Sequence, residues 1–357
     1  MKNLSRRGVI AATSACAILF ESDPRAARPN CFPTACSSPA PTVVLNTGSR
    51  IPSLGFGTYL TNGEELFDAL VHALRNGYRH IDTAAGYMNE PTVADAVQAS
   101  GVPRDELFIT TKLWCADHGR KRTERAIKQS LRALRTDYID LYLVHAPDNQ
   151  GSTPEEVARL RKESWQVLEE AHAAGTLRAI GVSNFEPRHI EALLREDVAD
   201  SKPGRDLPRV AATGQATAPT LMAAAERPPY RRGAVVPAVN QIELHPHIDQ
   251  QAVLEYCARK GITIEAYGAV GADGLLSDPA IRAVAKRYGR SEAQVSLRHT
   301  LQRKPGQIVL LAKSLTKGRI DENLRVFDWD IDPADARLLD ALARKDGRSY
   351  WDNSDVP

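Results

Sequence analysis

The stretch GYRHIDTAAGYMNE, residues 77–90, predicts a strand, a turn and the start of a helix in direct succession. Residues 80–84 are typical of a short strand and Gly86 of a turn. A helix should begin near Glu90, because Pro91 then falls in the first helical turn, where its missing N–H costs little. Asp82 is therefore placed at the C-terminal end of a strand and Tyr87 on the loop above it. Taken alone, the stretch fits equally well an Asp82 that caps the turn and a Tyr87 that packs on the rim.

The same strand-then-helix unit recurs along the chain from residue 42. A polar turn at residues 46–49 separates the short segments 42–45 and 50–51, which predicts a small hairpin before the first unit. The predicted strands are 53–59, 80–84, 107–114, 138–145, 177–183, 238–244, 263–269 and 308–313, and the predicted helices are 64–75, 90–100, 123–135, 154–174, 187–195, 249–260, segments within 278–303, and 318–326. Eight such units predict an α/β fold, a parallel (β/α)8 TIM barrel, rather than an open sheet.

The first 41 residues do not follow this alternation of strands and helices. Arg6 and Arg7 precede an apolar run that ends at Phe20, which is typical of an export signal, and the run is too short to span a bilayer. We therefore expect residues 1–41 to be a leader and linker and residues 42–357 to form the barrel. A cytoplasmic location is expected, with export or an organelle as the alternative if residues 1–41 act as a targeting segment.

Residues 196–236 also interrupt the strand–helix alternation, between the fifth predicted helix and the sixth predicted strand. The segment is rich in Pro, Gly, Ala, Thr and Arg, and it is too long for an ordinary connection. Connections of this kind lie at the N-terminal face of a barrel, away from the loops that build active sites. We expect a flexible surface insertion, with a partner-binding loop as the alternative.

The overall composition excludes several classes of function. Hydrophobic residues make up 43% of the chain and charged residues 25%, and the net charge is +2, which does not indicate a nucleic-acid-binding or membrane-surface protein. Cys115 and Cys257 are the two cysteines beyond residue 41, and no CxxC pair suggests structural zinc. We expect a monomer that acts on a small molecule, with no nucleic-acid partner, membrane span or bound metal.

Polar side chains close the predicted strands at the end where barrels build their sites. These residues are Asp82, Lys112, His145, Ser183, Asn184, Gln241, Tyr267, Lys313 and Ser314. Each one alone could be a solvated or hydrogen-bonded rim residue, but their convergence on one face favours a site. Asp82 and Lys112 could form an ion pair, and the Lys112 charge should lower the pKa of Tyr87. Tyr87 could then act as a general acid toward a carbonyl oxygen that His145 orients.

A site of this kind donates a proton but contains no source of electrons, so a cofactor is expected. The dinucleotide fingerprint G-x-G-x-x-G is absent. Lys313, Ser314 and Arg319 lie at the end of the last strand and in the first turn of the following helix, where backbone N–H groups and cations can bind phosphate. From spacing alone, a solvated rim is an equally good interpretation of these three residues.

Several longer stretches resemble signature sequences of the aldo-keto reductases. The resemblance covers residues 42–352 apart from 196–236, and it is carried by residues 77–90, LFITTKLW (107–114), DYIDLYLVHAP (137–147), LRAIGVSNF (177–185), VNQIELHP (239–246), EAYGAVG (265–271) and AKSLTKGRIDEN (312–323). It implies an NADPH-dependent carbonyl reductase built on a (β/α)8 barrel.

The resemblance also implies roles for individual positions. The family's catalytic tetrad is matched by Asp82, Tyr87, Lys112 and His145, and its substrate pocket by Trp114 and His145. The groups that hold the nicotinamide carboxamide are matched by Ser183, Asn184 and Gln241, and the aromatic that stacks on the nicotinamide ring is matched by Tyr267. The 2′-phosphate site is matched by Lys313, Ser314 and Arg319, the adenine contacts by Glu322 and Asn323, and the cofactor cleft by Gly57 and Thr58.

Three positions depart from the family pattern. Ala146 stands where a Trp is frequent and should widen the substrate pocket, Gly268 replaces a Ser and should loosen the pyrophosphate clasp, and Ala312 replaces a Pro. The chain ends soon after Trp351, as in members that act on small aldehydes, keto sugars or dicarbonyls. The expected function is reduction of small aldehydes or ketones to alcohols, of the alcohol dehydrogenase (NADP+) type. The alternative is an NADPH-binding regulatory or redox-sensing subunit with slow turnover.

Overall fold

The computed structural model describes residues 40–151, 153–195, 230–231, 233–353 and 355–357. The candidate targeting segment therefore lies outside the described residues, except for residues 40 and 41. The Pro41 carbonyl accepts a hydrogen bond of 2.8 Å from the Ser53 N–H, so this end of the predicted linker is already attached to the barrel. Within the described residues, no helix is long and apolar enough to cross a membrane.

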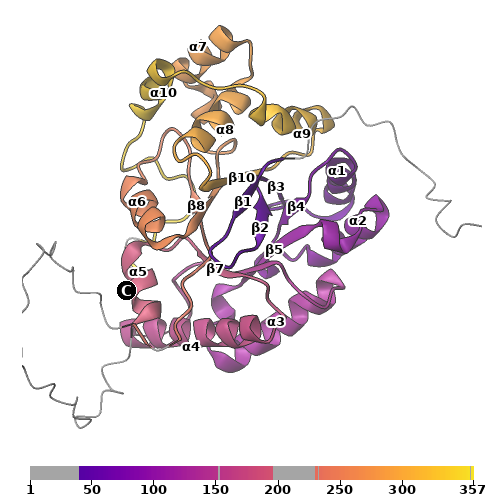
Figure 1. The fold of residues 1–357 in the computed structure, drawn as a ribbon, viewed down its shortest axis with the longest axis vertical. Helices are drawn as coiled ribbons and strands as arrows, with labels where there is room; N and C mark the ends of the chain where they lie inside the picture. Colours follow the sequence, from indigo (N-terminus) through magenta and orange to yellow (C-terminus); the bar gives the residue numbers. More distant parts are fainter. Residues whose placement is uncertain (1–39, 152, 196–229, 232, 354) are drawn as a thin grey trace, which may run out of the picture. The chain divides into compact units, whose positions relative to one another are not determined.

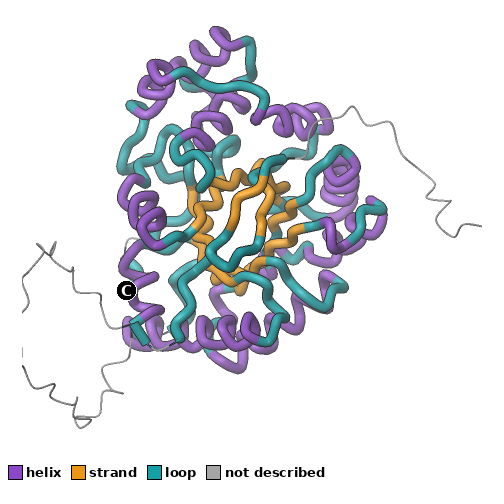
Figure 2. The backbone as a smooth tube through the Cα atoms, viewed as in Figure 1, coloured by secondary structure: helices purple, strands orange, loops and turns teal. Residues whose placement is uncertain are grey.

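Eight parallel strands close into a barrel, which confirms the predicted fold class (Figure 1; Figure 2). Around the barrel their order is β10, β3, β4, β5, β6, β7, β8, β9. The strands are β3 (Leu54–Gly57), β4 (His80–Asp82), β5 (Phe108–Leu113), β6 (Leu141–Val144), β7 (Ile180–Ser183), β8 (Val239–Glu243), β9 (Thr263–Tyr267) and β10 (Ile308–Ala312). Side chains alternate along each strand, so every second residue faces the barrel interior.

Helices follow the strands in the predicted order and surround the barrel (Figure 2). They are α1 (Gly63–Arg75), α2 (Glu90–Ser100), α3 (Arg120–Leu134), α4 (Pro154–Ala173), α5 (Pro187–Leu194), α6 (Gln251–Lys260), α7 (Pro279–Tyr288), α8 (Glu292–Gln302), α9 (Lys317–Leu324) and α10 (Pro333–Asp340). Short 3₁₀ turns are η1 (Ala85–Tyr87), η2 (Arg104–Glu106), η3 (Cys115–Asp117), η4 (Leu275–Ser277) and η5 (Arg325–Phe327). Helix α10 is not among the helices predicted from the sequence.

The predicted hairpin closes one end of the barrel. Strands β1 (Thr42–Val44) and β2 (Arg50–Pro52) pair in antiparallel register. Val43, Leu45 and Ile51 form one buried cluster with residues that begin the barrel strands, including Phe108 and Leu141. Figure 1 shows both hairpin strands lying across the barrel. This apolar floor occupies the N-terminal end of the strands and leaves the C-terminal end for polar groups.

Strand β6 is shorter than the predicted strand 138–145. Ile139 makes only an isolated bridge to Leu177, and the Asp140 carboxylate, rather than a backbone carbonyl, accepts the hydrogen bond of the Ile109 N–H at 3.0 Å. A side-chain hydrogen bond therefore replaces a backbone hydrogen bond at the N-terminal end of these strands. The apolar pattern of the sequence does not reveal such a replacement.

Part of the insertion predicted at residues 196–236 lies within the described residues. Arg195 pairs with Tyr230 in an antiparallel bridge, and the Arg231 N–H donates to the Leu194 carbonyl at 2.9 Å. The Val235 N–H donates to Glu169 at 2.9 Å, and Tyr230 and Val235 pack against the main core. The end of the predicted insertion is thus part of the barrel, while residues 196–229 and 232 lie outside the described residues.

Candidate active site

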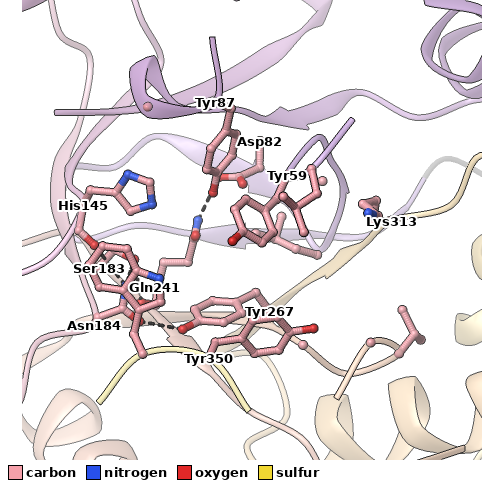
Figure 3. Close-up of a pocket in the computed structure, with 18 of the residues that line it drawn as sticks. Tyr59, Asp82, Tyr87, His145, Ser183, Asn184, Gln241, Tyr267, Lys313 and Tyr350 are labelled. Atoms are coloured by element: carbon pink, nitrogen blue, oxygen red, sulfur yellow. Dashed lines mark hydrogen bonds between the residues drawn. The ribbon is translucent and has the colours of Figure 1, made fainter. Parts of the chain in front are cut away.

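The C-terminal ends of the strands surround a pocket of about 450 Å³, shown in Figure 3. Its lining includes many of the residues predicted from the strand ends, together with aromatic side chains from loops and from the end of the chain. The lining residues are Gly57, Tyr59, Leu60, Asp82, Gly86, Tyr87, Trp114, His145, Ser183, Asn184, Gln241, Tyr267, Gly268, Val270, Gly271, Leu311, Lys313, Tyr350 and Trp351. Strand ends that lie far apart in the sequence are therefore brought together here.

A buried ion pair lies at the floor of this pocket. The Lys112 Nζ donates to both carboxylate oxygens of Asp82 at 2.8 Å and to the Thr83 carbonyl at 2.8 Å. The Tyr87 hydroxyl lies 3.3 Å from the same Nζ. Lys112 is fully buried, so its charge depends on Asp82 for compensation. The structure thus places Asp82, Lys112 and Tyr87 together, as the sequence predicted.

The effect of this pair on Tyr87 differs from the expectation. Burial raises the pKa of Tyr87 well above its usual value, and the negative charge of Asp82 raises it further. The expected lowering by Lys112 is therefore wrong for the free protein. The main reason is that burial penalises the charged phenolate, and the Lys112 ammonium is already paired with Asp82. A raised pKa keeps the phenol protonated, which is the form that a general acid requires.

His145 lies beside Tyr87 at the pocket wall, with the two ring centroids 5.5 Å apart. Burial lowers the pKa of His145 well below its usual value, and the nearby Lys112 charge contributes in the same direction. The imidazole is therefore neutral near pH 7. Among the described residues, its Nδ1 has no hydrogen-bond partner. His145 is thus a neutral polar group with hydrogen-bonding capacity at the pocket.

The three predicted carboxamide residues are close together, but they differ in what they can still bind. The Ser183 hydroxyl donates to the Gln241 backbone carbonyl at 3.0 Å. The Asn184 amide nitrogen donates to the His145 carbonyl at 3.0 Å, and its Oδ1 accepts from the Tyr267 hydroxyl at 2.7 Å. The Gln241 Nε2 donates to Asp82, whereas the described residues provide no partner for its Oε1.

Tyr267 lines the pocket and contacts Tyr350 near the end of the chain (Figure 3). Their ring centroids are 5.6 Å apart, in an edge-to-face arrangement. Gly268 has a φ of +82°, and a Cβ at this position would lie 3.2 Å from the Tyr350 ring. Glycine therefore permits both the left-handed backbone and the approach of Tyr350. The expected loosening of a pyrophosphate clasp by Gly268 remains a prediction.

The remaining predicted cofactor residues are spread around the pocket rather than gathered within it. Gly57 and Lys313 line it. Thr58 does not, because it is buried and its hydroxyl donates to the Asp82 carbonyl at 3.0 Å. Arg319 is exposed on α9, and Ser314 is partly exposed before it. Glu322 accepts a hydrogen bond from the Ser291 hydroxyl, and Asn323 is buried; neither lines the pocket.

Aromatic residues that were not predicted from the sequence complete the pocket. Trp351 stacks on His145 with an interplanar angle of 10°, and its ring centroid is 6.2 Å from that of Trp114. Ala146 is fully buried and does not line the pocket, and the widening expected from it remains a prediction. The Trp351 ring covers His145. Tyr59 packs against Tyr87 with the ring centroids 5.1 Å apart.

Gly86, one of the small residues between Asp82 and Tyr87, lies against the Trp114 ring. A Cβ on Gly86 would lie 2.4 Å from the Trp114 ring, so glycine is needed for the two loops to approach each other. His245 and His247, which flank a proline, each contact a carboxylate at 2.9 Å, from Glu243 and Asp278 respectively. Within the described residues, no cluster of His, Cys, Asp and Glu is suited to a metal ion.

Comparison with known proteins identifies the family. The sequence model of the aldo/keto reductase family matches residues 53–204 and 219–344. An aldo-keto reductase of Mycolicibacterium smegmatis is 37% identical over 307 residues, covering 85% of this chain and 94% of that protein. A glyoxal reductase of Bacillus subtilis is 35% identical over 308 residues, covering 86% and 94%. The solved structure of a Bombyx mori aldo-keto reductase in complex with NADP is 30% identical, with a TM-score of 0.69, and the match covers 89% of this chain and 97% of that chain.

The family match spans the eight barrel strands and the lining of the pocket apart from Tyr350 and Trp351. The gap in this match, at residues 205–218, falls within the segment 196–236 that interrupts the strand–helix alternation. The closed parallel barrel agrees with this relationship. The chain belongs to the aldo/keto reductase family.

Proposed function

We propose that this protein is an NADPH-dependent reductase that converts the carbonyl group of small aldehydes or ketones to an alcohol. The observation that supports this proposal most strongly is the Tyr87 phenol. It lines the pocket, its pKa is raised, and its oxygen lies 3.3 Å from the ammonium of a buried Lys112–Asp82 pair. A phenol that stays protonated at the pocket wall is suited to donate its proton to a carbonyl oxygen.

The chain's residues divide the chemistry between orientation and proton transfer. Bound NADPH would supply the hydride that reduces the carbonyl carbon. Tyr87 transfers its hydroxyl proton to the carbonyl oxygen, which completes the alcohol. The Lys112 Nζ donates a hydrogen bond to the Tyr87 oxygen, and Tyr87 then recovers a proton from solvent. The neutral His145 hydrogen-bonds the carbonyl oxygen and holds it near the Tyr87 hydroxyl.

The residues at the strand ends fit a nicotinamide cofactor. Gln241 offers an acceptor, Oε1, that has no partner among the described residues, and Tyr267 presents an aromatic ring to the same pocket. We propose that Ser183 and Asn184 act with Gln241 on the carboxamide. Lys313 at the pocket, with Ser314 and Arg319 beyond it, would hold the 2′-phosphate, and Glu322 and Asn323 would lie near the adenine.

The lining of the pocket favours a small substrate with an aromatic or planar group. Tyr59, Trp114 and Trp351 surround the Tyr87–His145 pair, so the reacting carbonyl would be enclosed by rings. The Bacillus subtilis relative, a glyoxal reductase, supports the inclusion of small dicarbonyls among the substrates. The alcohol dehydrogenase (NADP+) assignment is part of this proposal.

The test is a screen of the full chain for NADPH consumption with glyoxal, aromatic aldehydes and keto sugars. NADPH binding is measured separately, by quenching of tryptophan fluorescence, with NADH as the matched control. Consumption of NADPH with formation of the alcohol supports the proposal. Binding without turnover on any reactive aldehyde would contradict it and favour a regulatory subunit, and a lack of binding would contradict the cofactor assignment.

A further inference from the structure

We propose that Glu265, a fully buried carboxylate that does not line the pocket, is a positioning residue that sets the amide orientation of Gln241. In this orientation Gln241 presents its Oε1 to a ligand as a hydrogen-bond acceptor, and the ligand group it suits is the N–H of the nicotinamide carboxamide. This inference rests on the proposed NADPH-dependent function, and it assigns a specific role to a residue that the reaction does not otherwise use.

The barrel register places the two residues side by side. Gln241 in β8 and Glu265 in β9 are paired across neighbouring parallel strands, and both face the barrel interior. Glu265 shares this face with Tyr267, which lies at the pocket, because side chains two residues apart point the same way. Glu265 therefore lies one layer below the pocket, directly beneath the residues that surround it.

Two carboxylates accept hydrogen bonds from the same amide nitrogen. The Gln241 Nε2 lies 2.6 Å from the Glu265 Oε2 and 2.8 Å from the Asp82 Oδ2. An amide nitrogen carries two hydrogens, so each carboxylate receives one of them. If the amide were rotated by half a turn, its oxygen would face two carboxylate oxygens with no hydrogen between them. The pair of carboxylates therefore determines which way the amide points.

Asp82 is less able than Glu265 to impose this orientation alone. Both of its oxygens already accept from the Lys112 Nζ at 2.8 Å, so its negative charge is largely compensated. No Lys or Arg forms an ion pair with Glu265 among the described residues; the His80 Nε2 lies 3.2 Å from the Glu265 Oε1. Its second oxygen, Oε2, is thus available to Gln241.

The His80 side of the network is closely packed. His80 is fully buried, and its Nε2 also lies 3.1 Å from the Thr110 hydroxyl. A Cβ on Gly55 in β3 would lie 2.6 Å from the His80 Nδ1, so glycine is required where β3 passes the ring. Glu265 is therefore held by rigid strands, which is the support that a positioning residue needs.

The consequence is that Gln241 can only accept from a ligand. Both amide hydrogens are used inside the barrel, and Oε1 has no partner among the described residues. The Asn184 amide, in contrast, both donates to His145 and accepts from Tyr267. The negative charge of Glu265 also contributes to keeping the nearby Tyr87 protonated, because it is one of the charges that raise the pKa of this phenol.

The test compares the binding of NADP+ with that of its 3-acetylpyridine analogue, which lacks the carboxamide N–H. Dissociation constants come from quenching of tryptophan fluorescence, so the readout does not depend on turnover. The wild-type protein should prefer NADP+ by about fivefold to tenfold, the value of one hydrogen bond. In Glu265→Leu this preference should fall to near one, because the amide can then rotate. The matched control is Glu90→Gln, a buried glutamate bonded to Thr111 and remote from Gln241, and it should keep the wild-type preference.

A folded Glu265→Leu protein that keeps the wild-type preference would overturn the proposal, as would a wild-type protein without any preference. Glu265→Asp is the second variant, in case Glu265→Leu does not fold. It keeps the charge but withdraws the carboxylate by one methylene, so the preference should fall, and an unchanged preference would overturn the proposal. A wild-type protein that binds neither dinucleotide contradicts the proposed function itself, which is a separate failure.

Discussion

Tyr87 is the residue at which cofactor binding and proton transfer can be separated most clearly. Tyr87→Phe removes the hydroxyl but keeps the ring that packs between Tyr59 and His145. We expect the reduction rate to fall by roughly 10²- to 10⁴-fold, the usual contribution of a general acid, while the NADPH dissociation constant changes little. Single-turnover kinetics and fluorescence titration measure the two quantities. The control is Tyr288→Phe, whose hydroxyl bonds Asp332 outside the pocket, and an unchanged rate in Tyr87→Phe would refute the role of the phenol.

The pH dependence of reduction follows from the same residues. The raised pKa of Tyr87 means that the acid form persists as the pH rises, and the lowered pKa of His145 means that the imidazole stays neutral as the pH falls. Neither group therefore changes charge between about pH 6 and pH 9, because both shifts point away from this window. We expect kcat/KM to be flat across it with a non-ionisable aldehyde. A decline with an apparent pKa near 6.5, the reference value of histidine, would show that His145 titrates freely.

At the level of elements, the convergence of the strand ends could be predicted from the sequence. The placement of the C-terminal tail, the segment after α10 that carries Trp351, could not. Asp82, Lys112 and His145 close apolar strands, and a closed barrel necessarily brings such positions together. Trp351 follows α10 without any periodic pattern, and its placement depends on contacts distant in sequence. The N–H groups of Ser349 and Tyr350 donate to Glu243, and the Asn353 amide donates to the Asn184 carbonyl.

Glu265 illustrates a second limit of prediction. Strand alternation places it on the same face as Tyr267, and this signal was present in the sequence. Its contact with Gln241 depends on the register between β8 and β9, which the sequence pattern of each strand does not specify. The raised pKa of Tyr87 was missed for a similar reason, since the balance between Lys112 and Asp82 depends on burial as well as on proximity.

Gly347 connects the tail to the barrel and provides a test of the tail as an element. A Cβ at this position would lie 1.9 Å from the His247 carbonyl oxygen, so Gly347→Ala must displace backbone. We expect a loss of roughly 1–3 kcal/mol in the free energy of unfolding, as for other overpacked sites. The displaced tail should also carry Trp351 away from His145 and raise KM for aromatic aldehydes. Guanidinium unfolding and steady-state kinetics measure the two effects.

The matched control for this change is Gly318→Ala. Gly318 lies in the first turn of α9 and has no positive φ, and a Cβ at this position would have no atom within 4 Å. Alanine is the better helix former by about 0.5–1 kcal/mol, so stability should be unchanged or slightly higher. If Gly347→Ala is as stable as Gly318→Ala and binds aromatic aldehydes normally, the tail does not depend on this contact.

For the whole molecule, the barrel separates structural from chemical roles along its axis. Val43 and Ile51 of the hairpin seal an apolar floor at one end, and the ion pair of Asp82 and Lys112 lies under the pocket at the other. Connections at the floor end are therefore free to vary without changing the site. The segment between α5 and β8 enters and leaves the barrel at this floor end.

Replacing residues 198–227 with a short Gly/Ser linker tests this separation. Arg195 and Tyr230 form an antiparallel bridge, which holds the two ends of the segment about 5 Å apart, so a short linker can span them. The hydrogen bonds of Arg231 to Leu194 and of Val235 to Glu169 lie outside the replaced residues. Each halving of a loop lowers its closure cost by roughly 0.6 kcal/mol, so the free energy of unfolding should not fall. NADPH affinity and kcat/KM should match those of the full chain. A loss of either with the fold intact would show that the segment contributes to the site, and a drop in stability would show that the barrel depends on it.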